Sequence, residues 1–121
     1  MDTGQTEEGN VNTKSNGERG WIFGHFIDPT SPFHSDDFEI KWSKNPQGAS
    51  KIAAKANKVA KTVCILVRGK FRVDFPDLNK SVLLEKEGDY VFFGNGIVHS
   101  WKALEESLTI NIRWPSLPND Q

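Results

Sequence analysis

The chain has 121 residues, enough for one domain whose core stands without disulfide bonds or bound metal. Its 15 basic and 16 acidic residues give a net charge of −1, which argues against a phosphate-neutralising surface, so we expect no nucleic-acid partner. The N-terminus lacks the apolar core of a signal peptide, and no apolar run approaches the roughly 20 residues of a membrane helix. We therefore expect a soluble, cytoplasmic protein with no membrane partner.

Residues 1–19 are rich in glycine, asparagine, threonine, glutamate and serine, and Val11 is their only aliphatic residue after Met1. Such a segment cannot bury enough apolar area to offset the entropy lost on ordering. The composition predicts a flexible polar tail over residues 1–19 and a single domain over residues 20–121.

From Trp21 onward, short apolar runs are separated by glycine, proline, asparagine and aspartate, a pattern typical of antiparallel β-structure. Trp21–Ile27 predicts a first strand. Asp37–Trp42 alternates strictly, so we expect Phe38, Ile40 and Trp42 to face a core while the polar residues between them face water, a neighbouring strand or a pocket.

The rest of the chain predicts a series of further strands. The helix formers between Asn45 and Lys61 favour a short helix on propensity alone. The other apolar runs predict strands over Thr62–Val67, Phe71–Phe75, Ser81–Glu85, Tyr90–Phe93, a run that begins at Ile97, and Ser107–Trp114. About eight strands, with turns roughly every eight to twelve residues, indicate an all-β closed fold.

The segment Gly94-Asn95-Gly96 separates two of these apolar runs. Glycine and asparagine tolerate positive φ, so this segment predicts a tight hairpin between Tyr90–Phe93 and the strand that carries His99.

This region resembles the second motif of the cupins, in which a proline, two glycines, a histidine and an asparagine stand at fixed spacing. Gly88, Gly96 and His99 match, while Gly94 replaces the proline and Ala103 replaces the asparagine. The resemblance implies a cupin-like double-stranded β-helix, which is a jelly-roll barrel. It also places a strand between Asn45 and Lys61, and we adopt that interpretation.

The first cupin motif carries two histidines and a glutamate ahead of a glycine, and here it lacks all three ligands. Anchored on Gly69, the glutamate position falls on Thr62. The histidine pair falls on Lys55 and Asn57, or on Ala56 and Lys58 if the gap is shorter. His99 is then the only matching metal ligand, so we expect no metal cofactor. A divalent metal is the less favoured alternative, with non-standard ligands drawn from His25, His34, Asp36, Asp37 and Glu39.

The interior of such a barrel is a candidate ligand site. His99 is either a structural histidine or an imidazole that binds a ligand or transfers a proton. Alternation places Trp101 on the same face as His99, and Thr62, Cys64 and Leu66 on one face of their strand. Together with Phe71, these residues would line a mostly apolar small-molecule pocket, or they would simply fill the barrel.

Three functions follow from these alternatives. The first is a binding or sensing protein that holds a small organic ligand without metal. The second is a metal-dependent enzyme of the dioxygenase or isomerase type, using His99 with ligands such as His34 or Glu39. The third is a protein-interaction module with a filled barrel. The resemblance also implies a homodimer, for which exposed aromatics among Trp21, Phe23, Trp42 and Trp114 would form the interface.

Overall fold

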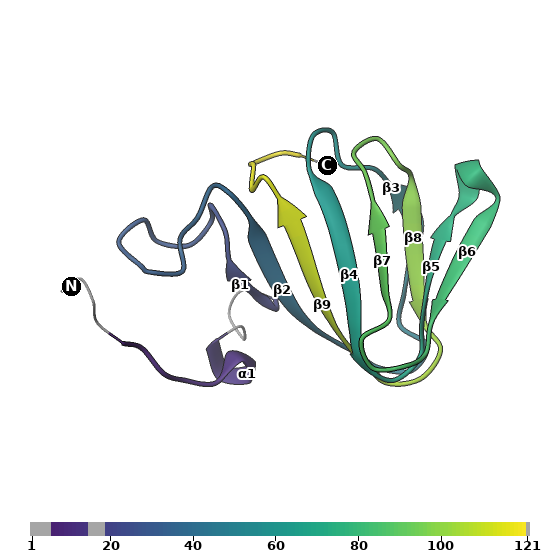
Figure 1. Cartoon of the computed structure of the whole chain (residues 1–121), viewed down its shortest axis with the longest axis horizontal. Coiled ribbons are helices and arrows are strands. Elements are labelled where there is room, and N and C mark those ends of the chain that lie inside the picture. The colour runs from purple at the N-terminus through teal and green to yellow at the C-terminus, as the bar shows by residue number, and fades with distance from the viewer. Residues whose placement is uncertain (1–5, 15–18, 121) are drawn as a thin grey trace.

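The computed structural model describes residues 6–14 and 19–120, except for the side chain of Ile52, and almost all of its regular structure is β-strand (Figure 1). A single helical turn, α1 (Val11–Lys14), precedes the strands, and a 3-10 turn, η2 (Pro76–Leu78), connects two of them. The strands are β1 (Trp21–Phe23), β2 (Glu39–Asn45), β3 (Ser50–Lys55), β4 (Lys61–Arg68), β5 (Phe71–Phe75), β6 (Lys80–Leu84), β7 (Tyr90–Phe93), β8 (His99–Ala103) and β9 (Ser107–Trp114).

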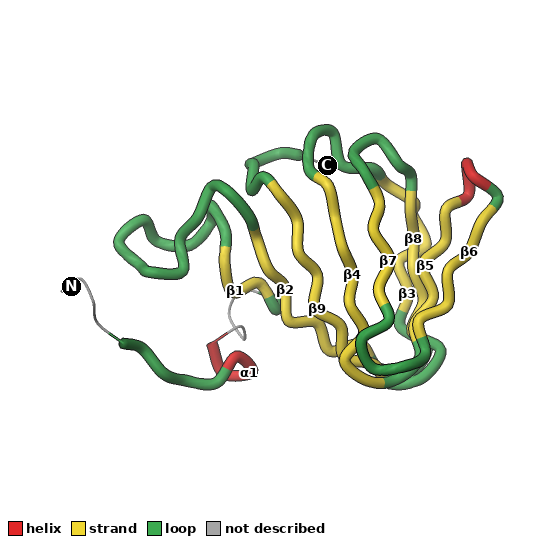
Figure 2. Tube along the Cα trace, viewed as in Figure 1, coloured by secondary structure: helices red, strands yellow, loops and turns green. Residues whose placement is uncertain are grey.

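The strands form two antiparallel sheets. One sheet has five strands in the order β1-β2-β9-β4-β7, and the other has four in the order β3-β8-β5-β6. Figure 2 shows the two sheets joined by loops at both ends of the strands. Apart from β1 with β2 and β5 with β6, the paired strands are not consecutive in sequence, as expected of a jelly roll, so the all-β prediction is confirmed. The strand adopted between Asn45 and Lys61 is β3, which pairs with β8.

The apolar core lies between β4 and β7 on one side and β5, β6 and β8 on the other. Alternation along these strands turns every second side chain inward. The buried cluster consists of Cys64, Leu66, Phe71, Val73, Phe75, Leu84, Val91, Phe93 and Ala103.

The hairpin predicted at Gly94-Asn95-Gly96 is wrong, because β7 and β8 belong to different sheets. β7 pairs with β4, whereas β8 pairs with β3 and β5. Gly96 does have positive φ, at 78°, and its N–H donates to the carbonyl of Asn57 at 2.8 Å. The glycines therefore form a corner between the two layers, because the strands they join bury their apolar faces from opposite sides of the core.

The predicted orientation of Asp37–Trp42 is also wrong. In β2 the polar residues point inward: Glu39 is buried with 5% of its surface exposed, and Lys41 lines a cavity. Ile40 and Trp42 lie on the opposite, outer face of the sheet and are partly exposed. The strand and its alternation are correct, but this part of the barrel encloses polar groups, so the apolar residues face outward.

The aromatic residues expected at a dimer interface divide into two groups. Trp42 and Trp114 lie on the outer face of the five-stranded sheet. Trp21 lines the interior, and Phe23 packs against the rings of Phe33 and Phe38 within the chain. Trp42 and Trp114 are therefore the stronger candidates for contact with a second molecule.

Part of the predicted tail contacts the barrel. Trp42 Nε1 donates to Asn12 Oδ1 at 2.9 Å, and Lys14 Nζ lies 3.8 Å from the centre of the Phe33 ring. Residues 1–5 and 15–18 lie outside the described part of the chain. The flexibility of residues 1–19 and their boundary with the domain therefore stay predictions.

The glycine of the first motif is required by the fold. Gly69 has φ of 100°, and a Cβ there would meet the carbonyl oxygen of Glu106 and lie 2.6 Å from Ser107 Cα. We expect Gly69→Ala to lower the free energy of unfolding by about 2 kcal/mol or more, because it adds a backbone clash to left-handed strain. Denaturant unfolding measures this loss.

Gly94→Ala is the matched control. Gly94 does not have positive φ, and nothing lies within 4 Å of a Cβ added there. Its substitution should change stability by less than about 0.5 kcal/mol. Equal losses in the two variants would show that the contact at Gly69 has no special role.

Candidate functional site

The two sheets enclose a cavity of about 450 Å³, here called the barrel cavity. It is lined from both sheets by side chains that alternate along their strands, as period-two geometry requires. The lining residues are Arg19, Trp21, Lys41, Ser43, Asn45, Lys51, Asn57, Thr62, Cys64, Phe71, Val73, Phe93, His99, Trp101, Thr109, Asn111 and Arg113. Most of these are polar, which differs from the mostly apolar pocket predicted from the sequence.

Strand pairing places the polar lining in rows across the five-stranded sheet. Glu39 is opposite Arg113, and Arg113 is opposite Thr62, so these three side chains are neighbours across β2, β9 and β4. Lys41 is opposite Asn111, which is opposite Cys64 in the next row. Residues far apart in the chain therefore form one continuous polar wall.

The structure brings five of the six predicted site residues to this cavity: Thr62, Cys64, Phe71, His99 and Trp101. Leu66 does not line it, because it is only 1% exposed and belongs to the apolar core. Burial raises the pKa of Cys64 to about 12, so its thiol stays protonated near neutral pH. The rings of Phe71 and Trp101 stack with centres 5.2 Å apart and form an aromatic wall.

The imidazole of His99 is held in one orientation. Its Nδ1 lies 3.0 Å from the carbonyl of Ile97, which can only accept, so Nδ1 carries the proton. Burial lowers the pKa of His99, and the charges of Lys51 and Arg113 lower it further, although the bond to Ile97 opposes this. The ring is therefore neutral near pH 7, with Nε2 as its acceptor.

The cavity carries an excess of positive charge. Arg19, Lys41, Lys51 and Arg113 line it, and no Asp or Glu is among the described lining residues. Burial lowers the pKa of Lys41 first, and the charges of Arg113, Arg19 and Lys51 lower it further. Burial likewise lowers the pKa of Lys51, with contributions from Lys55 and Arg113. These cations repel one another inside the barrel.

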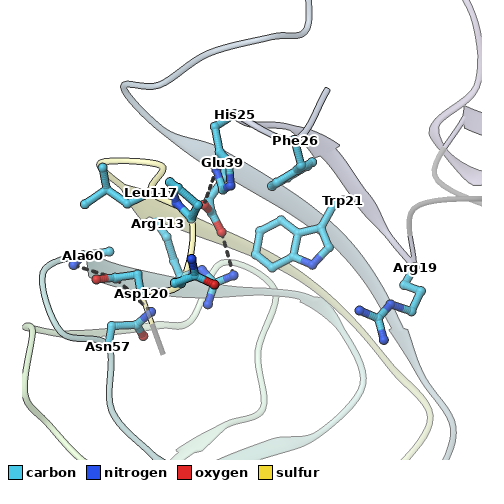
Figure 3. Close-up of a pocket in the computed structure, with 12 residues that line it drawn as sticks. Arg19, Trp21, His25, Phe26, Glu39, Asn57, Ala60, Arg113, Leu117 and Asp120 are labelled. Carbon is cyan, nitrogen blue, oxygen red and sulfur yellow. Dashed lines mark hydrogen bonds and ion pairs between the residues drawn. The ribbon is translucent and has the colours of Figure 1, made fainter. Parts of the chain in front are cut away.

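A second cavity of about 410 Å³, here called the side cavity, shares Arg19, Trp21, Asn57 and Arg113 with the first. Figure 3 shows the Glu39 carboxylate between His25 and Arg113. Arg113 Nη2 lies 2.6 Å from Glu39 Oε2, and its guanidinium carbon lies 4.4 Å from the centre of the Trp21 ring. The guanidinium is thus held between a carboxylate and an aromatic face at the boundary of the two cavities.

A hydrogen-bond chain orients the carboxylate of Glu39. Ser116 Oγ donates to Glu39 Oε1 at 2.8 Å and lies 2.7 Å from His25 Nδ1. The backbone N–H of His25 also donates to Ser116 Oγ, at 3.0 Å. One carboxylate oxygen of Glu39 therefore accepts from Ser116 and the other contacts Arg113. The fixed carboxylate in turn restricts the orientation of the Arg113 side chain.

The residues at the cupin metal positions do not fit a metal ion. Thr62, Asn57 and His99 line the barrel cavity, but Asn57 Nδ2 already donates to Asp120 Oδ2 at 3.3 Å, and Lys55 is exposed. Only His99 supplies a good ligand, and the nearby cations oppose a divalent ion.

The alternative ligands do not converge on one point either. His25 lies 3.8 Å from Glu39, and His34 lies 3.7 Å from Asp36, as two separate pairs. Within residues 6–14 and 19–120, no group of three His, Cys, Asp or Glu side chains could hold a metal ion.

Sequence reasoning missed the cationic residues of the site. Arg113 was visible only as one polar position in an alternating strand, and Lys41 as another. Their inward orientation depends on how β2 and β9 pair, so no local pattern could have identified them. Lys51 is opposite Trp101 in the ladder of β3 and β8, which explains why it reaches the cavity.

Structural comparison defines the class of fold. The chain is similar to KdgF from Halomonas sp., with a TM-score of 0.64 and 21% identity over 86% of this chain and 93% of that one. It is similar to a cupin-2 domain containing protein from Shewanella frigidimarina, with a TM-score of 0.56 and 21% identity over 88% and 92%. The DMSP lyase DddQ from Ruegeria pomeroyi gives a TM-score of 0.61 and 17% identity over 78% and 46%.

By sequence, the chain matches no protein-family model and no curated protein. The shared architecture nevertheless shows that it has the cupin fold, and the predicted jelly-roll barrel is confirmed. In the described part of the chain, no helix has the length and apolar character needed to cross a membrane.

The lowered pKa of His99 predicts a pH dependence of stability. The unfolded chain takes up the proton near pH 6.5, whereas the folded protein does so only at lower pH. The free energy of unfolding should therefore fall as pH drops from about 7 toward about 5.5. Urea unfolding across this window measures the slope.

His99→Gln should lose part of that slope, since glutamine does not titrate and keeps a polar side chain. His34→Gln, at a partly exposed histidine that lines neither cavity, is the comparison variant. An unchanged slope in His99→Gln would contradict the assignment.

Proposed function

We propose that this chain binds a small organic molecule in the barrel cavity without the help of a metal ion. The observation that carries this proposal is the hydroxyl of Thr62. Thr62 occupies the glutamate position of the first cupin motif and belongs to the cavity wall; its hydroxyl is buried and has no hydrogen-bond partner among the described residues, and a rotation about χ1 would turn it toward the cavity. A buried hydroxyl without a partner costs about 1–3 kcal/mol, and a bound ligand would remove that cost.

The size and lining of the cavity support the same proposal. A volume of about 450 Å³ falls within the usual range for small-molecule sites. The stacked rings of Phe71 and Trp101 offer an apolar surface, and His99 Nε2 offers a polar contact. An open cavity with free polar groups favours ligand binding over a filled interaction module.

A metal-dependent enzyme of the dioxygenase or isomerase type is the alternative that the cupin resemblance implies, and the similarity to a DMSP lyase is consistent with an enzyme. Untagged protein purified without chelator should carry far less than one metal ion per chain by plasma mass spectrometry. Near-stoichiometric metal that disappears in His99→Ala would instead support the metal-dependent alternative.

The cost of the unpartnered hydroxyl predicts a specific effect of Thr62→Val. Valine keeps the shape of threonine and removes the polar group, so the ligand-free variant should be as stable as the wild type or more stable, by up to about 1 kcal/mol. The same variant should show smaller melting-temperature shifts with any compound that stabilises the wild type. Thermal unfolding with a panel of neutral sugars, amines, carboxylates and phosphate esters measures both effects.

Thr13→Val is the control, because Thr13 is exposed in α1 and lies outside the barrel cavity. Thr13→Val should change neither the stability of the ligand-free protein nor the melting-temperature shifts caused by the compounds. A Thr62→Val protein that is clearly destabilised, or that responds to compounds as the wild type does, would show that the hydroxyl has a structural role only.

A further inference from the structure

The charge of the barrel cavity indicates what kind of molecule it binds. Of its four cationic residues, Arg113 has a carboxylate partner, Glu39. Arg19, Lys41 and Lys51 form no ion pair with any residue that the structure describes. A cavity with uncompensated cations attracts an anion, because the attraction of the bound anion offsets both the mutual repulsion of the cations and the cost of their desolvation.

The best-defined anion position is beside Arg113. The guanidinium is fixed by Glu39 and Trp21, and Thr62 is directly opposite Arg113 in the ladder of β4 and β9. Residues opposite each other in a ladder have Cβ atoms about 5 Å apart, so one oxyanion can accept from both side chains once the buried Thr62 hydroxyl rotates about χ1 toward the cavity. The unpartnered hydroxyl of Thr62 thereby gains an acceptor.

We infer that the ligand of the barrel cavity is a small organic anion whose carboxylate or phosphate group binds Arg113, Thr62 and Lys51. This inference rests on the proposed function and adds the chemical class of the ligand. The organic part lies against the wall of Phe71 and Trp101, which an inorganic anion would leave uncovered. His99, neutral and accepting through Nε2, suits a hydroxyl or a protonated group of the same ligand.

The test compares anions with neutral molecules of the same shape. The probes are acetate, succinate, benzoate and glycerol phosphate, each paired with its amide or free alcohol at constant ionic strength. At least one anion should raise the melting temperature by a few degrees, saturate, and shift the ring resonances of His99. Its neutral counterpart should do neither. The comparison of carboxylates with the phosphate ester identifies which anion the site prefers.

Two lysines on one strand provide matched variants. Lys51→Gln should lower the affinity for the best-binding anion by about tenfold, since it removes a cation from the cavity wall. Lys55→Gln makes the same charge change on β3 at an exposed residue outside the cavity and should have little effect. Arg113→Lys keeps the positive charge beside Glu39 but loses the planar set of N–H donors of the guanidinium group. This variant should also weaken binding of the anion.

The outcomes separate the two proposals. The proposal of an anionic ligand would be overturned if neutral compounds bound as well as the anions, or if the anions bound equally to both lysine variants. Either result would leave the proposal of a small-molecule site intact. If none of the anions shows saturable binding, the proposal of an anionic ligand is overturned as well. Stoichiometric metal in the wild type would overturn the proposed function itself.

A separate observation concerns the outer face of the five-stranded sheet. Because polar residues of β2, β4 and β9 point inward, the residues between them form a nearly continuous apolar surface outside. Its members, here called the outer face, are Ile40, Trp42, Val63, Ile65, Val67, Tyr90, Phe92, Ile110, Ile112 and Trp114. No described element covers the side of this face near β7, where Tyr90 and Phe92 are 67% and 51% exposed.

The properties of the outer face fit a second copy of the same chain. Two lysines on the same side of the sheet, Lys44 and Lys61, flank the outer face at opposite ends, opposite Leu108 and Trp114 in the ladders. The centre of the face therefore bears no charge that would repel an identical face. Four strands about 4.8 Å apart, each contributing two or three outward residues, present several hundred Å². Two such faces bury on the order of 1,000 Å², the lower limit for a specific interface.

We propose that two copies of the chain pair through the outer face about a two-fold axis. Sedimentation or light scattering at tens of micromolar should give twice the chain mass of 13.6 kDa. Ile112→Lys and Phe92→Lys should each give a folded monomer, as judged by circular dichroism. Leu83→Lys, at an apolar residue of β6 that is 43% exposed on the other sheet, should leave the dimer unchanged. A monomeric wild type, or a dimer that persists in both lysine variants, would overturn the interface.

Discussion

The pairing of β9 with β2 and β4 is the constraint on which the site depends. In this ladder Glu39, Arg113 and Thr62 occupy one row, and a shift of one residue would turn all three side chains to the outside. The Glu39 and Arg113 ion pair helps to hold that register, because a buried carboxylate without its partner is strongly unfavourable. The register that places Arg113 and Thr62 in the wall of the barrel cavity is therefore also the register that positions the central strand.

The same arrangement gives the cavity a cost in the absence of a ligand. Lys41 and Lys51 have lowered pKa values because they lose water and face other cations, and Thr62 keeps an unpartnered hydroxyl. Each of these groups would be more favourable in water or beside an anion. Natural proteins retain such unfavourable groups mainly where function requires them. A ligand that neutralises them stabilises the folded chain in proportion to its affinity and concentration.

Much of the fold was predictable, because strands depend on local patterns. The alternation of Ser107–Trp114 and of Phe71–Phe75 identified β9 and β5, and motif spacing identified the barrel. Which face of a strand points inward was not predictable. The expectation that Ile40 and Trp42 face a core assumed that interiors are apolar, and it fails where the interior is a polar cavity. The corner at Gly96 was taken for a hairpin for a related reason, since local turn chemistry does not say whether the next strand joins the same sheet.

The site was predictable only where a motif marked it. His99 and Thr62 were found through the cupin spacing, and Trp101 through alternation from His99. Arg113 and Lys51 carry no such mark, because their importance comes from strand pairing between distant segments. Once β9 is placed in the sheet, the inward Thr109, Asn111 and Arg113 and the outward Ile110, Ile112 and Trp114 are consequences of one alternation. This sheet is polar inside and apolar outside, and the organic anion and the second copy of the chain proposed above would each cover one of its two faces.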